Sequence, residues 1–172
     1  VWGELEGMLK AGGMGIFFES LMHRKVTRQD YQCIVKPLCK PYAKVTDRKG
    51  VTIKLDYPVA LLRSVEDIGE LNLERYGLPL FENFALVDAI VQPDTLIQYT
   101  VSPINHKGAV KELEAIRKQL LEKDSKKHKM IFMVPARNIK TFKWQKSLES
   151  IAQYVTSDDE VVSELSLYTN SE

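Results

Sequence analysis

A short run of purely apolar residues near the end of the chain limits the folds that it can adopt. Residues 130–134 read MIFMV, and Pro135 ends the run. A run of this length without polar alternation is typical of a strand that is buried on both faces. It follows residues 107–121, whose apolar side chains recur at the spacing of an amphipathic helix. This order predicts an α/β fold in which helices cover a central mixed sheet.

The size and charge of the chain restrict its organisation and its partners. Its 172 residues suit a single domain. Lys and Arg number 24 and Asp and Glu number 23, so a surface for nucleic acid would have to be local. The two cysteines are too few for a disulfide framework or a cysteine-rich zinc site. No apolar run approaches the ~20 residues of a membrane-spanning helix, so we expect no membrane partner.

Other periodic segments predict the elements around this strand and helix. Further helices are expected at residues 16–25, 28–35 and 142–148 and from residue 157 onward. Strands are expected on both sides of a turn at residues 47–50, at residues 85–91 and 96–101 in the centre of the sheet, and at residues 152–155. Residues 61–82, which glycine and proline interrupt, are expected to form an irregular connection.

Asp88 interrupts a stretch that otherwise suits a buried strand. The stretch reads NFALVDAIV, and it contains no basic partner for the carboxylate. A carboxylate inside a sheet is costly unless it is paired, hydrogen-bonded or bound to a metal. Asp88 is therefore either a structural residue that accepts backbone hydrogen bonds or a member of a functional site.

The next predicted strand offers a partner for Asp88. Side chains alternate along residues 96–101, so Gln98 and Thr100 share one face. A turn of even length would pair Asp88 with Tyr99, whereas an odd loop or a bulge would set it opposite Gln98. We expect the odd loop. A carboxylate and an amide oxygen would then converge on one point, as a divalent cation such as Mg²⁺ requires.

A third oxygen ligand could come from Glu19 in the first predicted helix. Phe17, Phe18 and Leu21 flank this residue and place it near the apolar face, where glutamate is rare. The alternative is an ordinary acid on the surface of the helix. Gln98 and Thr100 likewise have an alternative as ordinary strand residues.

Four basic residues are candidates for contact with the phosphates of a nucleic acid. His106 and Lys107 precede the amphipathic helix, although they could simply form the turn at its start. Lys126 and Lys127 belong to a basic run that acids dilute, and most such runs are solvated loops.

Several segments together resemble the C-terminal restriction-endonuclease-like domain of the Crinkler and retrotransposon hot spot (RHS) proteins. NFALVDAI resembles the first acidic strand of that domain, and LIQYTVSPINHKG resembles the next strand with its following histidine. KMIFMVP is similar to the apolar strand, and FKWQ with IAQYVT to the tail. The order and spacing are similar over nearly the whole chain.

The resemblance implies a PD-(D/E)XK nuclease-like domain over residues 1–172, with a restriction-endonuclease-like central mixed sheet flanked by helices. Glu19 matches the acid of the helix, Asp88 the acid of the strand, and Gln98-Tyr99-Thr100 the (D/E)XK tripeptide. Such sites bind Mg²⁺ or Mn²⁺, activate a water molecule and cleave DNA. The resemblance also implies a C-terminal part of a longer protein, an upstream P-loop ATPase domain and a nuclear location, including that of an effector in a host nucleus.

Two departures from the motif leave different functions open. Gln98 replaces an acid, and Thr100 replaces the lysine that would polarise the water and neutralise developing charge. A metal-dependent nuclease is our first hypothesis. The alternatives are a catalytically inactive nuclease-fold module, which binds nucleic acid or a partner protein, and an α/β interaction domain without a site.

Overall fold

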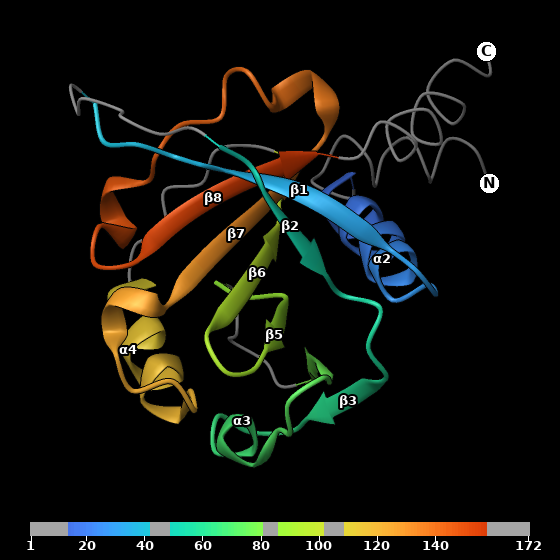
Figure 1. Ribbon diagram of the computed structural model, residues 1–172, viewed down its shortest axis with the longest axis vertical. Helices are drawn as coiled ribbons and strands as arrows, with labels where there is room; N and C mark the ends of the chain where they lie inside the picture. The colour runs from blue at the N-terminus through green and yellow to red at the C-terminus, as the bar shows by residue number, and fades with distance from the viewer. Residues whose placement is uncertain (1–13, 42–48, 81–85, 102–108, 158–172) are drawn as a thin grey trace.

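The protein is built around one curled mixed β-sheet with helices on both of its faces, as the computed structural model shows (Figure 1). The structure describes residues 14–41, 49–80, 86–101 and 109–157. The sheet has eight strands in the order β2-β1-β8-β7-β6-β5-β4-β3. The predicted α/β architecture with a central mixed sheet is therefore confirmed.

The strands are short, and parallel and antiparallel pairs meet at β6, which pairs antiparallel with β5 and parallel with β7. The first four strands are β1 (Gln32–Pro37), β2 (Val51–Lys54), β3 (Val59–Leu62) and β4 (Tyr76–Pro79). The last four are β5 (Ala89–Val91), β6 (Thr95–Tyr99), β7 (Lys129–Val134) and β8 (Ala152–Ser157).

The two longest described helices, α2 (Met14–Val26) and α4 (Ala109–Gln119), cover opposite faces of the sheet (Figure 1). The apolar side chains of α2 pack with Ile97 and Tyr99 of β6, whereas those of α4 pack with Leu96. Neighbouring β6 side chains therefore enter two different cores, as strand geometry requires. The short elements are α3 (Asp67–Glu70), η2 (Ser125–Lys127), η3 (Ala136–Asn138) and η4 (Lys146–Leu148).

Most of the predicted elements are present with adjusted ends. The helices expected at residues 16–25 and 107–121 are α2 and α4. The four strands expected after residue 84 are β5, β6, β7 and β8. The first half of the predicted hairpin lies largely in residues 42–48, and the terminal helix beyond residue 157; both lie outside the described residues.

Three predictions of local structure are wrong. Residues 32–37 form strand β1 rather than a helix, because Ile34 and Val35 are β-branched and the strand pairs with β2 and β8. The expected irregular connection instead contains α3 and β4, together with the end of β3. The helix expected at residues 142–148 is reduced to the single turn η4.

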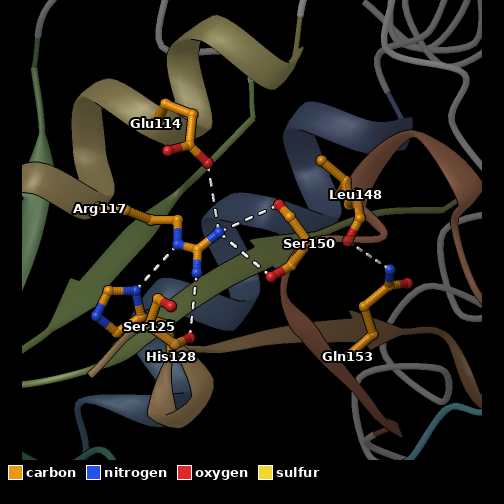
Figure 2. A network of polar contacts seen from close by, with 7 residues as sticks. All are labelled: Glu114, Arg117, Ser125, His128, Leu148, Ser150 and Gln153. Carbon is orange, nitrogen blue, oxygen red and sulfur yellow. Dashed lines mark hydrogen bonds and ion pairs between the residues drawn. The ribbon is translucent and has the colours of Figure 1, made fainter. Parts of the chain in front are cut away.

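A buried arginine joins α4 to the segments around it (Figure 2). Arg117 is 9 % exposed, and its Nε donates to Nδ1 of His128 at 3.0 Å. Its terminal nitrogens donate to the carbonyl oxygens of Ser125 and Ser150 at 3.1 and 3.3 Å and to the Ser150 hydroxyl at 3.1 Å. The carboxylate of Glu114, 3.4 Å from the guanidinium, is a further and charged partner. The network joins α4 to η2 and to the segment before β8.

Candidate functional site

The side of α2 that borders the sheet carries the first two residues of the site. Phe18, Met22 and Val26 form the fully buried stripe of this helix. Glu19 and His23 each follow a buried residue by one position and stand one helical turn apart, so both lie beside that stripe. The side chain of His23 is 17 % exposed and that of Glu19 is 40 % exposed. Solvent therefore reaches the glutamate, while most of the imidazole is enclosed.

Asp88 reaches the same face through an irregularity at the start of β5. The register pairs Ala89 with Ile97 and leaves the loop Gln92–Asp94, whose length is odd as predicted. The Asp88 N–H nevertheless also donates to the Ile97 carbonyl, at 2.8 Å. Asp88, just before β5, and Ala89, its first residue, then both face Ile97, which is the arrangement of a β-bulge. The bulge turns the Asp88 side chain toward the face that Ala89 occupies.

A chain of hydrogen bonds runs through this face of the sheet. Nε2 of His23 lies 3.4 Å from Oε1 of Glu19, and its Nδ1 lies 2.7 Å from the hydroxyl of Tyr76. The hydroxyls of Tyr76 and Tyr99 are also 2.7 Å apart. The backbone N–H of Tyr99 donates to Oδ2 of Asp88 at 2.7 Å. Glu19 and Asp88 thus stand at the two ends of one connected group.

The imidazole is also fixed by ring contacts with the two tyrosines. The His23 ring meets the rings of Tyr76 and Tyr99 edge to face, with centroid separations of 5.8 and 4.9 Å. Both tyrosines are buried, at 1 % and 5 % exposure. Burial raises the pKa of each phenol well above its ordinary value, so both hydroxyls keep their protons.

The negative charges of Asp88 and Glu19 interact with each other. Burial raises the pKa of Asp88 from 3.8 to about 7, and the negative charge of Glu19 adds to this increase. The hydrogen bond from the Tyr99 N–H acts in the opposite direction. The repulsion between two such carboxylates is reduced when one of them takes up a proton or when both bind a cation.

The structure separates Gln98 and Thr100 from the two acids. Gln98 is 2 % exposed and follows the alternation of Leu96, so it faces the core under α4. Thr100 continues the same alternation and is 4 % exposed. Either an odd loop or a bulge alone would have set Asp88 opposite Gln98, but the structure has both, and the two shifts of one residue cancel.

Of the predicted basic residues, Lys126 and Lys127 are not brought to the acids either. Lys126 and Lys127 form part of η2, which precedes β7 at the end of the sheet where β6 begins. Asp88 contacts Ile97 and Tyr99, toward the other end of β6. The Lys127 ammonium lies 3.5 Å from the Glu122 carboxylate. His106 and Lys107 lie outside the described residues.

The donor set suits a hard cation held by few protein ligands. In the described part of the chain, no group of three or more His, Cys, Asp and Glu side chains is arranged to hold a metal ion. The charge of Glu19 on α2 nevertheless acts on Asp88, which lies beside β5. Mg²⁺ commonly binds through one or two carboxylates and keeps several waters. Two carboxylates are a donor set that such an ion can use, and Gln98 lies on the other face of β6.

The sequence reasoning missed three members of this group: His23, Tyr76 and Tyr99. His23 follows Glu19 at the spacing that places two helical side chains together, and this signal was available in the sequence. Tyr76 lay in a segment that was expected to be irregular. Tyr99 was assigned to the face opposite Gln98, and that assignment is correct.

Comparison with known proteins identified no relative of the chain. The chain matches no model of a protein family, no curated protein and no solved structure. None of the helices in the described ranges has the length and apolar character needed to cross a membrane.

Proposed function

We propose that the chain is a divalent-metal-dependent nuclease domain of the Crinkler and RHS type, in which Glu19 and Asp88 hold the cation. The observation that carries the proposal is the chain of contacts through His23, Tyr76 and Tyr99 that joins Glu19 to Asp88. The raised pKa of Asp88, to which the Glu19 charge contributes, agrees with it. A helix that packs on a central mixed sheet and supplies one acid is also what the resemblance implies. DNA is then the substrate, and an upstream P-loop ATPase domain and a nuclear location are part of the same proposal.

In this proposal each residue has a role set by its contacts. Glu19 and Asp88 would bind Mg²⁺ or Mn²⁺, which supplies a Lewis acid and an activated water when bound. The Tyr99 N–H holds Oδ2 of Asp88, so Oδ1 would be the oxygen that binds the cation. Gln98 and Thr100 are outside the proposed site, because they face the core under α4.

A second candidate function is a nuclease-fold module that binds nucleic acid or a partner protein without cleaving it. The observation that favours it is the placement of Gln98 and Thr100. These positions match the motif acid and lysine, yet they face away from Glu19 and Asp88. A site with Thr100 in place of the motif lysine loses the positive charge that this lysine would supply to the transition state.

Cleavage assays on plasmid and single-stranded DNA distinguish the two functions. The nuclease proposal expects cleavage with Mn²⁺, its loss on addition of a chelator, and a decrease of about 100-fold or more for Asp88→Asn and Glu19→Gln. Glu149→Gln is the matched control, because Glu149 is exposed and lies on a different segment, after η4. Binding of DNA that the chelator does not affect, without cleavage by the wild type, would establish the inactive module.

A further inference from the structure

The chemistry of the side chains determines which atom donates and which accepts in the chain of hydrogen bonds from Glu19 to Tyr99. A carboxylate only accepts hydrogen bonds, so Nε2 of His23, which faces Glu19, must carry the proton. In the neutral ring Nδ1 is then the acceptor, and the Tyr76 hydroxyl donates to it. The Tyr76 oxygen in turn accepts from the Tyr99 hydroxyl. One tautomer of His23 and one direction of donation satisfy all three contacts.

We propose that His23 is a positioning residue for Glu19, and that Tyr76 and Tyr99 fix the His23 tautomer that this task requires. The inference rests on the proposed function, because it gives Glu19 the role of a cation ligand. The 40 % exposed glutamate is a flexible side chain that the Nε2–H holds in one orientation. Outer partners that orient metal-binding side chains in this way strongly affect affinity.

Tyr99 connects the two ends of the site. Its backbone N–H holds Asp88, and its hydroxyl starts the chain of donors that ends on Glu19. Each carboxylate is therefore positioned from the same residue of β6. The tyrosine between Gln98 and Thr100 thus supports both acids, although the motif gives its position no role.

The first test uses variants that separate ring shape from hydrogen bonding. His23→Gln keeps a donor for Glu19 and an acceptor for Tyr76, whereas His23→Phe keeps an aromatic ring without either. Mn²⁺ binding, measured by its effect on solvent proton relaxation, should weaken about 10-fold or more in His23→Phe and be largely restored in His23→Gln. Tyr76→Phe should also weaken it. Tyr154→Phe is the control, since Tyr154 packs against the same core but belongs to β8. Thermal unfolding of each variant establishes that it is folded.

The second test does not depend on a metal or on cleavage. In ¹⁵N spectra of the metal-free protein, the neutral His23 ring should carry its proton on Nε2, and Tyr76→Phe should shift the Nδ1 resonance. Side-chain relaxation of Glu19 should show one orientation in the wild type and averaging in His23→Phe. A proton on Nδ1, or unchanged order of Glu19 in His23→Phe, would overturn the inference. Absence of Mn²⁺ binding by the wild type would instead overturn the proposed function, and the spectra would still decide the role of His23.

Discussion

The backbone N–H of Tyr99 lies 2.7 Å from Oδ2 of Asp88 and donates a hydrogen bond to it. This bond favours the ionised carboxylate, yet the pKa of Asp88 is about 7. Burial and the Glu19 charge therefore outweigh it. The site holds an acid that is only partly ionised near neutral pH in the absence of a cation.

Stability should depend on pH through Asp88. Between pH 4 and pH 7 the folded carboxyl, with its pKa of about 7, retains a proton that the unfolded chain, with a value of 3.8, releases. The free energy of unfolding should therefore fall as pH rises through this range and level off above it. Asp88→Asn keeps an oxygen for the Tyr99 N–H and cannot ionise, so it should remove this fall. Above pH 7 we expect Asp88→Asn to be more stable than the wild type by about 2 kcal/mol.

Urea unfolding in buffer with a chelator, repeated between pH 4 and pH 8, measures this difference. Asp94→Asn is the control, because Asp94 carries a carboxylate in the β5–β6 loop that pairs with Lys129 at 3.2 Å. It should follow the pH dependence of the wild type. A parallel decline of stability in Asp88→Asn would show that another group is responsible.

Divalent cations should stabilise the protein at pH 8 through Glu19 and Asp88. Bound Mg²⁺ or Mn²⁺ offsets the repulsion between the two carboxylates and binds only the folded state. At a concentration 100 times the dissociation constant, this gives about 2.7 kcal/mol of stabilisation. Differential scanning fluorimetry should show an increase in Tm for the wild type and Glu149→Gln, but little for Glu19→Gln or Asp88→Asn. An equal increase in all four proteins would place the cation elsewhere.

Removal of the Arg117 side chain should destabilise the fold without affecting the acid site. Arg117→Met loses hydrogen bonds to His128, Ser125 and Ser150, and it leaves buried acceptors without a donor. We expect a loss of about 3 kcal/mol in urea unfolding. Glu114→Gln is the control, because Glu114 is 52 % exposed and its ion pair with Arg117 should contribute less than about 0.5 kcal/mol. A small effect of Arg117→Met would mean that the guanidinium is not needed to keep α4 packed against the segments that contain Ser125 and Ser150.

Two glycine-to-alanine substitutions should differ in their effect on stability. A Cβ at Gly77 would lie 2.7 Å from Leu71 Cδ2 and 3.0 Å from the Ile90 carbonyl oxygen, so strands β4 and β5 would have to move apart. We expect Gly77→Ala to cost about 1–3 kcal/mol. At Gly69 the closest atom is the amide oxygen at the end of Gln119, which can turn away. Gly69→Ala should be nearly neutral by chemical unfolding, and similar losses for both would contradict this reasoning.

The sequence was sufficient to predict an element of secondary structure where one pattern dominated the segment. The apolar run ended by Pro135 predicted β7, and the spacing of Leu113, Ile116 and Leu120 predicted α4. It was insufficient for β4, because Gly77 suggested a break in the chain. The structure uses this glycine for the close approach of β5 within a strand. The helix predicted at residues 28–35 is replaced from Gln32 onward by strand β1, which ends at Pro37.

The sequence also predicted only part of the candidate site. The spacing around Glu19 and Asp88 singled out both residues, and the structure sets them within electrostatic reach of each other. A period of two cannot reveal a bulge, so alternation alone gave Asp88 the wrong partner. The contacts between His23, Tyr76 and Tyr99 join three separate elements, and their pairing is fixed only by the folded sheet.

The alternation of side chains along β6 has a practical consequence for protein engineering. A combinatorial library at Leu96 and Gln98 would vary the packing beneath α4, whereas one at Ile97 and Tyr99 would vary the surroundings of the carboxylates. Selection for thermal tolerance could thus be applied to one set of positions and selection for chemistry to the other. A single strand would then serve as the boundary between two separate design problems.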